Sequence, residues 1–415
     1  MNRLLLLALA GMTSIASTCH AEDWPEFLGP KGTGHYQGAE LPIEFGPTKN
    51  VTWKMPIPGK AWSSPIIVGG KVYLTTAVPV KTDAGTEHEL RALCLNAKTG
   101  KTIWDFEIFR EAAGDPKSHA KNSHASPTPI FDGKRLYIHF GHLGTAALDP
   151  AGQMIWKKVF TYKPVHGNGG SPVLADGKLI FACDGSDQQF TVALDAATGE
   201  TVWKTDRNHP SVQRRFSFAT PAVIKHDGIV QVISPGSDAF HSYDLKTGKE
   251  LWRVTFIGWS LIVKPVYGEG LVFCSTGYVT PNVLAVRPDG TGDVTKSHVA
   301  WTMKRGAPNT PTMILEGKEL YVLSDGGFLT CCDAKTGDVH YQERVPGNYS
   351  ASPILANGLL YLPNEKGQCT IVKVGKTFEV VGKTDMEEPT LASYAAVDGS
   401  LYVRTEGHLY RFDKK

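Results

Sequence analysis

Hydrophobic and polar residues follow one another along this chain in a pattern that is repeated eight times. The clearest copy spans residues 171–203 and contains a Ser-Pro pair, an apolar stretch, the turn Asp176-Gly177, a second apolar and aromatic stretch, and Trp203. Short apolar stretches between turn residues are typical of β-strands, and a repeat of about 45 residues with four such stretches is typical of a propeller blade. The pattern therefore predicts an all-β, eight-bladed β-propeller of four-stranded antiparallel blades.

Two anchors define the register of the eight copies. A proline opens seven of them, and Ala395 takes its place in the eighth; the prolines are Pro65, Pro127, Pro172, Pro221, Pro265, Pro311 and Pro353. An aromatic residue closes the copies, at Trp53, Trp104, Trp156, Trp203, Trp252, Trp301, Tyr341 and, less regularly, Phe378. Most copies also carry an Asp-Gly, Asn-Gly or Gly-Gly pair after the first stretch, as tight hairpin turns require.

The two ends of the chain are each incomplete as blades. Trp53 precedes the first opening proline, whereas the last copy, after Ala395, ends at Phe412 without a closing aromatic strand. A propeller whose ends share one blade leaves no exposed sheet edge at the junction. We therefore expect the N-terminal strand around Trp53 to join the last blade and close the ring.

Composition excludes some classes of partner. The 415 residues include 43 Lys and Arg against 41 Asp and Glu, a formal net charge of +2. A chain so close to neutral lacks the basic surface that is typical of nucleic-acid-binding proteins. Beyond the N-terminus, no segment is long and apolar enough to cross a membrane as a helix. We expect no nucleic-acid partner, no transmembrane segment and a monomeric protein.

The first residues are typical of an export signal. Arg3 is followed by the short apolar run 4–10, and small residues precede a cleavage site after Ala21. Acylation of Cys19, as in a lipoprotein, is the alternative, although the leucine usual before such a cysteine is absent. The chain is thus divided into a signal peptide (1–21), an N-terminal extension (22–49) and the propeller (50–415), and the protein is expected to be exported, periplasmic or secreted.

Six cysteines follow the predicted signal peptide. Cys94 and Cys331 occupy a repeat position where other copies have alanine or serine, and Cys332 takes the place of a leucine. Cysteine at such positions acts as a small hydrophobic residue. Because export permits disulfides, a vicinal disulfide between Cys331 and Cys332 stays open as the alternative.

One run of residues points to a known family. Residues 193–203 resemble the tryptophan-docking motif of PQQ-type propellers, and 94–104, 242–252 and 331–341 repeat this run at the same length. That family contains the quinoprotein dehydrogenases and the BamB-like envelope proteins. The opening residues 23–30 are also similar to the start of many exported members. The resemblance covers residues 23–412 and implies an eight-bladed propeller whose docking tryptophans are core residues.

Catalytic and metal-binding motifs do not stand out in the chain. P-loop, nucleophile-elbow and His-Glu-x-x-His patterns are absent. His139 and His142 lack a third zinc ligand, and Asp289 and Asp293 lie in a loop without the glycine and terminal glutamate of an EF-hand. A quinoprotein centre needs converging calcium ligands, and no such set is evident. We predict neither cofactor nor metal, and keep PQQ with calcium as the alternative that the resemblance implies.

Loop lengths indicate where a ligand would bind. The connections from Trp104 to Pro127 and from Trp203 to Pro221 are the longest between blades. Insertions on one face of a propeller often form a binding surface, and the segments before the opening prolines are expected at the mouth of the central channel on that face. The candidate ligand-binding residues in these segments are Trp62, His124, His166, Asn168, Arg214, Arg215, Phe216, Trp259, Asn309, Tyr349 and Tyr394.

These segments mix aromatic with hydrogen-bonding side chains, which suits a peptide, a sugar or a small polar ligand. The other interpretation is that they only close the channel and bind water. We predict a non-catalytic exported propeller that binds or scaffolds a protein, peptide or carbohydrate partner in the cell envelope. The competing class is a PQQ- and calcium-dependent quinoprotein oxidoreductase.

Overall fold

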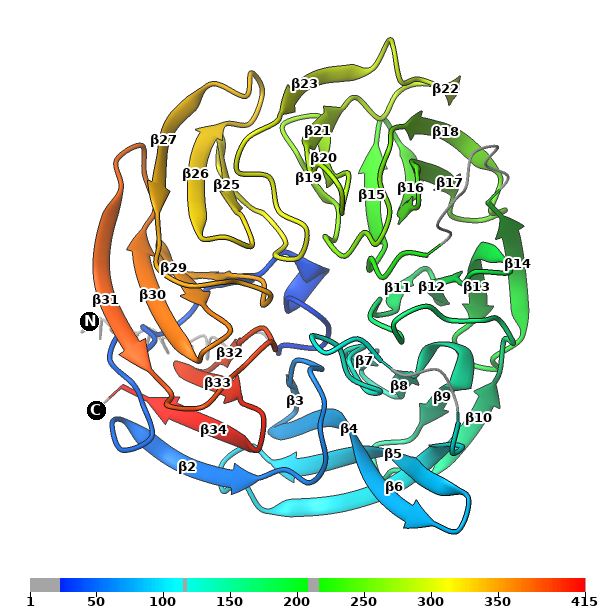
Figure 1. The fold of residues 1–415 in the computed structure, drawn as a ribbon, viewed down its shortest axis with the longest axis vertical. Helices are drawn as coiled ribbons and strands as arrows, with labels where there is room; N and C mark the ends of the chain where they lie inside the picture. The colour runs from blue at the N-terminus through cyan, green and yellow to red at the C-terminus, as the bar shows by residue number, and fades with distance from the viewer. Residues whose placement is uncertain (1–22, 115–117, 208–215, 415) are drawn as a thin grey trace, which may run out of the picture.

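Eight antiparallel sheets are arranged radially around a central axis (Figure 1). The computed structural model describes residues 23–114, 118–207 and 216–414. Each sheet has four strands of a blade, and the fourth and seventh sheets gain a fifth strand that runs parallel to its neighbour. The fold class and the number of blades predicted from the repeat are confirmed.

The strands follow the chain blade by blade. The first four blades contain β3 (Ile66–Val68), β4 (Lys71–Thr82), β5 (Gly85–Asn96), β6 (Thr102–Glu111); β7 (Ile130–Phe131), β8 (Leu136–His139), β9 (Thr145–Leu148), β10 (Met154–Lys158); β11 (Val173–Ala175), β12 (Lys178–Asp184), β13 (Gln189–Asp195), β14 (Thr201–Asp206); β15 (Ala222–His226), β16 (Ile229–Gly236), β17 (Ala239–Asp244), β18 (Glu250–Thr255) and the added β22 (Gly292–Asp293). The next three contain β19 (Val266–Gly268), β20 (Leu271–Ser275), β21 (Val283–Val286), β23 (Val299–Met303); β24 (Ile314–Glu316), β25 (Glu319–Leu323), β26 (Phe328–Asp333), β27 (Val339–Arg344); β28 (Ile354–Ala356), β29 (Leu359–Pro363), β30 (Gln368–Lys373), β31 (Glu379–Asp385) and the added β1 (His35–Tyr36). The short 3-10 helices are η1 (Pro30–Gly32) and η2 (Gly141–Leu143).

The eighth blade is built from both ends of the chain. It contains β32 (Ala395–Val397), β33 (Ser400–Arg404), β34 (His408–Asp413) and, from the N-terminal side, β2 (Val51–Pro56). Strand β2 pairs antiparallel with β34, as the blue and red strands in Figure 1 show. The predicted closure of the ring is therefore confirmed.

Tryptophans join six of the eight blades to the next one. Trp203 Nε1 donates to the carbonyl oxygen of Leu245 at 3.1 Å, and its ring lies against Gly248, where an added Cβ would come within 2.6 Å. Five other tryptophans bond in the same way to a carbonyl of the following blade: Trp53, Trp104, Trp156, Trp252 and Trp301. These rings thus serve as packing residues between blades, with their N–H groups satisfied.

A ring of hydroxyl groups aligns the blades around the axis. At six junctions a backbone N–H donates to the hydroxyl of the equivalent residue in the next blade, at 2.9–3.2 Å. The chain of bonds is interrupted after Thr220, because Lys264 has no hydroxyl. We call the hydroxyl-bearing members the hydroxyl ring: Ser64, Thr128, Ser171, Thr220, Thr312, Ser352 and Ser393.

The hydroxyl ring shows that three of the residues predicted to open a blade were misaligned. The strand-opening position is the one after the ring residue, so it is held by Pro129, Met313 and Tyr394, and not by Pro127, Pro311 and Ala395. In the run 126–129, Ser-Pro-Thr-Pro, either proline fits the pattern of the other copies. The hydrogen bond from Thr128 to Ser171 distinguishes them, and it exists only between folded blades.

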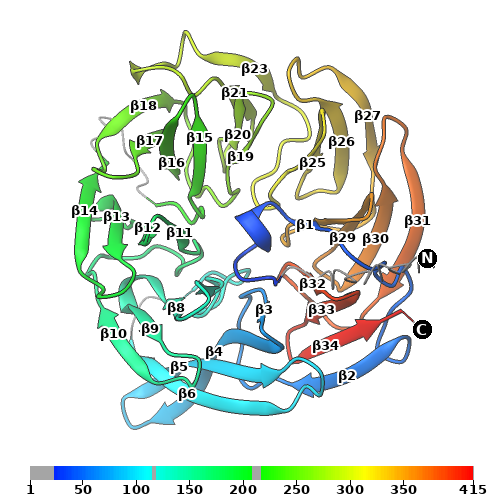
Figure 2. The same ribbon diagram turned by 180° about the vertical axis from the view of Figure 1, so that it is seen from behind.

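The N-terminal segment crosses the centre of the ring, as the dark-blue η1 in Figure 2 shows. Trp24 forms a bridge to Ile67 in the first blade, whereas β1 runs parallel to β28 in the seventh. Gly32 must stay a glycine, because its φ is +60° and an added Cβ would overlap Lys264 Nζ. The segment thus covers one end of the central channel, a role that the pattern of the sequence did not indicate.

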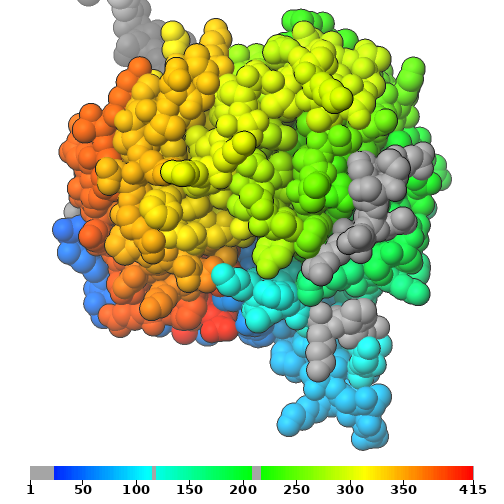
Figure 3. All heavy atoms as spheres, turned by 45° about the horizontal axis from the view of Figure 1, so that its top comes forward, coloured from blue at the N-terminus to red at the C-terminus, as the bar shows by residue number. Residues whose placement is uncertain are grey.

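The first blade is extended relative to the others. β4 and β5 have 12 residues each, and their hairpin projects from the disc in Figure 3. No helix within the three described ranges has the length and apolar character needed to cross a bilayer. The predicted signal peptide, with Cys19, lies outside the described residues.

The cysteines after the signal segment are free and buried. Cys331 packs with the hydrophobic cluster of Tyr321 and Tyr349, whereas Cys332 packs with that of Leu320 and Met313. Adjacent residues of a strand point to opposite faces, so each thiol fills a different core. The alternative of a vicinal disulfide is therefore not realised between these two residues.

Candidate functional site

A cavity of about 690 Å³ lies on the axis of the propeller. All seven members of the hydroxyl ring and a second set of residues two positions earlier in each repeat line it. Because side chains of an extended segment alternate, residues i and i−2 face the same way. We call the second set the upper ring: Trp62, Ser126, Gly169, Phe218, Ile262, Thr310, Ser350 and Leu391, one from each blade. Ser64, Thr128, Ser171, Thr220, Thr312, Ser352 and Ser393 are the hydroxyl-ring residues in the lining.

Aromatic rings form one part of the cavity wall. The rings of Trp259 and Tyr278 have their centroids 6.1 Å apart, and Phe216 lies edge-on to His166 at 5.4 Å. Burial and the neighbouring imidazole of His119 lower the pKa of His166, so this ring is neutral at pH 7. The wall therefore presents uncharged aromatic surfaces to a ligand.

The charged side chains of the lining are paired with the protein. Lys121 Nζ lies 2.7 Å from Glu365 Oε1. Asp325 accepts hydrogen bonds from Asn309 N and from the Thr310 hydroxyl, both at 2.6 Å. Since Lys121 is paired with a carboxylate and the Asp325 oxygens already accept hydrogen bonds, the cavity offers mainly hydroxyl groups and aromatic faces for new contacts.

Five of the predicted residues meet in this cavity. Trp62, His166, Phe216, Trp259 and Asn309 come from five different blades, and all of them line it. Arg214 and Arg215 lie outside the described residues. The expectation that segments before the strand-opening position surround the channel thus places about half of the proposed set together, and ligand binding by these residues stays a prediction.

Four other predicted residues do not line the cavity. Asn168 and Tyr349 point into their blades: Asn168 Nδ2 donates to Phe140 O at 3.2 Å, and Tyr349 is fully buried, with its hydroxyl donating to Pro346 O. Tyr394 holds the strand-opening position and packs against Phe45. His124 turns away toward Glu111, 2.5 Å from its carboxylate. These placements correct the set proposed from the sequence.

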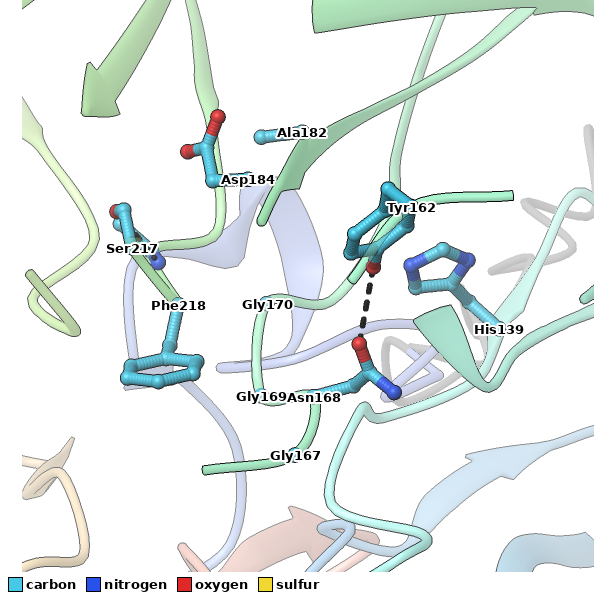
Figure 4. A pocket seen from close by; sticks show the side chains of 11 residues that line it. His139, Tyr162, Gly167, Asn168, Gly169, Gly170, Ala182, Asp184, Ser217 and Phe218 are labelled. Atoms are coloured by element: carbon cyan, nitrogen blue, oxygen red, sulfur yellow. Dashed lines mark hydrogen bonds between the residues drawn. The ribbon is translucent and has the colours of Figure 1, made fainter. Parts of the chain in front are cut away.

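Asn168 instead belongs to a small polar cavity of about 20 Å³, which has room for one water molecule (Figure 4). Its Oδ1 accepts a hydrogen bond from the Tyr162 hydroxyl at 2.9 Å. Asp184 also lines this space, and burial raises its pKa to about 6 against the opposing effect of Arg207. The volume is too small for an organic ligand, so we assign the cavity to structure.

His139, in the same small cavity, predicts a pH dependence of stability. Burial lowers its pKa to about 3, whereas an unfolded histidine titrates near 6.5. The unfolded chain therefore binds this proton first, and the stability that His139 contributes above pH 6.5 is lost as the pH falls. We expect a loss of roughly 2 kcal/mol in the free energy of unfolding at pH 5.

Urea unfolding at pH 7.5 and pH 5 checks this prediction. The variant His139→Asn cannot titrate, so its stability should fall by about 2 kcal/mol less than that of the wild type over the same interval. Equal losses in the two proteins would show that the His139 imidazole does not cause the pH dependence.

Sequence reasoning missed several residues of the cavity. Phe27 comes from the N-terminal segment, and His119 and Lys121 come from the long loop of the first blade. The length of that loop was a usable signal. The position of Phe27 was not predictable, because it depends on the path of residues 23–36 across the ring.

The described lining does not fit a calcium-bound quinone. Calcium takes six to eight oxygen ligands, usually with several carboxylates. Asp325 is the single carboxylate among the described lining residues, and its oxygens already accept hydrogen bonds from Asn309 and Thr310. We therefore derive no chemistry through a quinone at this site.

Comparisons with known proteins agree with this architecture. Residues 46–212 and 187–415 match the family described as outer membrane protein assembly factor BamB. The solved structure of BamB from Moraxella catarrhalis superposes with a TM-score of 0.61 at 12% sequence identity, covering 88% of this chain and 99% of that one. At this identity the likeness shows the fold alone.

Curated relatives include proteins with different activities. Tetrathionate hydrolase of Acidithiobacillus ferrooxidans is 21% identical over 302 residues, which cover 68% of this chain and 53% of that protein. Polyvinylalcohol dehydrogenase of a Pseudomonas species is 25% identical over 247 residues, covering 50% and 36%. The chain thus spans about half or less of the length of these two relatives.

Proposed function

Because the chain belongs to the family described as outer membrane protein assembly factor BamB, we propose that it is a non-catalytic binding module of the cell envelope whose central cavity holds a neutral saccharide. The proposal includes export of a monomer through the signal peptide at 1–21. The single observation that carries it is the composition of the cavity wall, in which aromatic faces and a ring of hydroxyl groups surround about 690 Å³.

A saccharide suits this wall better than a charged peptide. Sugar rings present apolar C–H faces that pack on aromatic side chains, and their hydroxyls exchange hydrogen bonds with serine and threonine. Trp259 and Tyr278 supply aromatic faces in the cavity wall, and the serine and threonine hydroxyls of the hydroxyl ring supply hydrogen-bond partners. A peptide terminus would need an unpaired charge, but Lys121 and Asp325 are engaged within the protein.

The proposed function predicts loss of saccharide binding when the aromatic wall is removed. Trp259→Ala and Tyr278→Ala should each weaken binding of neutral oligosaccharides by about tenfold or more, because an aromatic anchor contributes roughly 1–2 kcal/mol. Tyr278 is 58% exposed, so its replacement should leave the melting temperature unchanged. Calorimetric titration with the oligosaccharides that an array identifies is the measurement.

Phe328→Ala is the matched control, because Phe328 is a partly exposed aromatic residue outside the cavity. It should bind like the wild type. Binding that survives both cavity variants would refute this site.

A separate experiment tests the alternative function of a PQQ-dependent oxidoreductase, by adding PQQ and Ca²⁺ to the purified protein. A stoichiometric bound chromophore, together with dye-linked oxidation of an alcohol, would overturn the non-catalytic proposal in favour of an oxidoreductase.

A further inference from the structure

Three side chains with metal-ligating atoms meet on the first blade, away from the cavity lining. They are His88 on β5, Glu111 at the end of β6, and His124 on the loop that follows. Each offers one imidazole nitrogen or carboxylate oxygen, and these atoms all lie within 4.8 Å of one another. Within the described residues, no other group of three His, Cys, Asp or Glu side chains converges in this way.

Two members of the cluster are held by the sheet itself. His88 and Glu111 are direct partners in the antiparallel ladder between β5 and β6. Directly opposite residues have Cβ atoms about 4.5–5.5 Å apart, so their two side chains start from a separation fixed by backbone hydrogen bonds. Ligands that stand on strands are positioned more accurately than ligands on loops. Most of the site is therefore in place before an ion arrives.

The distances suit a single small cation. Glu111 Oε2 lies 3.1 Å from His88 Nδ1 and 2.5 Å from His124 Nδ1, and the two imidazole rings are stacked with centroids 4.1 Å apart. Ligand atoms bound at about 2.0–2.2 Å to a tetrahedral ion lie roughly 3.4 Å from one another. The distance from Glu111 to His88 is already close to that spacing, and the distance from Glu111 to His124 would lengthen by roughly 1 Å on binding an ion.

Burial and charge favour a cation at this point. The Glu111 side chain is 4% exposed, whereas the two imidazoles are 23% and 20% exposed. Among the described residues, the ion-pair contacts of Glu111 are with these two histidines alone. A buried carboxylate is costly without a positive partner, and a divalent ion shared by the three side chains would compensate it. The partly exposed rings leave the outer side of the site accessible to solvent.

We propose that His88, Glu111 and His124 bind a divalent transition-metal ion, with zinc preferred. Two imidazoles and one carboxylate suit zinc and the neighbouring transition metals, whereas calcium and magnesium take oxygen ligands. Three protein ligands leave a fourth position for water. The proposal does not depend on the saccharide that we assign to the central cavity.

The ion would tie the projecting hairpin to a loop that forms part of the cavity wall. In this loop Ser123 Oγ accepts a hydrogen bond from Trp62 N at 3.2 Å, and Asn122 Nδ2 donates to His166 O at 2.9 Å. His119, Lys121 and Asn122 of the same loop line the cavity. A metal ion bound through His124 therefore holds the loop against two residues of the candidate ligand site.

Metal titration of the full chain tests the proposal. The protein is stripped with EDTA, dialysed and titrated calorimetrically with ZnCl₂; we expect one equivalent of zinc to bind. CoCl₂ should give the visible absorption bands of a cobalt ion with nitrogen and oxygen ligands. The variants His88→Ala, Glu111→Gln and His124→Ala should each weaken zinc binding by about a hundredfold or more, since loss of even an outer-shell partner costs roughly 10–100-fold.

His408→Ala is the matched control, because His408 Nδ1 lies 2.9 Å from Glu388 Oε2 in a pair that forms no three-residue cluster. This variant should bind zinc like the wild type, and CaCl₂ should not compete. The proposal is overturned if the wild type binds no stoichiometric zinc, or if folded Glu111→Gln and His124→Ala proteins bind it equally well. If a variant fails to fold, the wild-type cobalt spectrum decides, and a spectrum of hydrated cobalt alone would reject the site.

Discussion

Deletion of residues 50–56 will lower the free energy of unfolding by more than about 5 kcal/mol and replace one unfolding transition by two. The deletion removes β2, which covers the edge of β34 along its length. It also removes Trp53, whose ring lies on Gly100 of the first blade and whose Nε1 donates to Ala97 O at 3.0 Å. Truncation of one buried tryptophan alone costs roughly 3–5 kcal/mol.

The loss of cooperativity follows from the topology of the ring. In the other seven blades the four strands follow one another along the chain, whereas the three C-terminal strands of the eighth blade are attached to β2, and through it to the first blade, only by noncovalent contacts. Without β2, the eighth blade has three strands and an open edge, so it should unfold before the rest and should aggregate through that edge. Urea unfolding followed by circular dichroism and by tryptophan fluorescence is the measurement.

Trp104→Ala is the matched control for the deletion. Trp104 docks on Gly152 and donates to Pro150 O across the junction of the first and second blades, with the same geometry as Trp53. We expect a loss of about 3 kcal/mol with a single transition, because the chain still links these blades. A deletion variant that unfolds in one step at the wild-type urea concentration would contradict closure by β2.

Replacement of Arg404 by alanine will lower the free energy of unfolding by about 3 kcal/mol. Arg404 lies on β33 in the eighth blade and is fully buried, so its environment lowers the pKa of the guanidinium. Its Nη1 donates to Ser63 Oγ at 2.7 Å and to Thr75 O at 2.8 Å, both in the first blade. Alanine would leave the Thr75 carbonyl without this donor and open a cavity at the closing junction.

The same substitution should affect the ligand site. Ser63 stands between Trp62 and Ser64, which both line the central cavity. We expect Arg404→Ala to weaken saccharide binding as well as stability. Arg253→Ala is the control: Arg253 is a partly exposed residue paired with Glu250 at 2.7 Å, and its loss should cost less than about 1 kcal/mol. An Arg404→Ala protein as stable as Arg253→Ala would refute the role of Arg404 at the junction.

The metal cluster shows why pattern reading left part of the chemistry out. Sequence analysis considered His139 and His142, which are close in the chain, and predicted no metal. His88 and Glu111 are 23 positions apart and become neighbours only through the register of β5 and β6. Their pairing was not predictable from spacing, because β-bulges within this ladder shift the register twice. His124 was identified for the channel, but the structure turns it toward Glu111.

The cavity shows how a small error in register changes a predicted site. A shift of one residue in an extended segment exchanges the side chains that face the channel with those that face the core. Tyr394 was proposed for the channel mouth because Ala395 was taken as the anchor, and it is a core residue. Tyr349 is also a core residue, although its anchor Pro353 was aligned correctly. Trp62 and the rest of the upper ring lie at a constant offset of two from the hydroxyl ring, a rule that becomes visible once Thr128 and Thr312 are aligned correctly.

The repeat by itself determined the all-β class, the eight blades, the tryptophan junctions and the closure by the N-terminal strand. These features depend on periodic apolar positions and turn residues, which are local properties written in each copy. Tertiary structure alone decided which side chains face the axis, how residues 23–36 cover one end of the channel, and where His88, Glu111 and His124 meet. Those outcomes depend on hydrogen-bond register between strands and blades, and such long-range pairing leaves no fixed spacing in the chain.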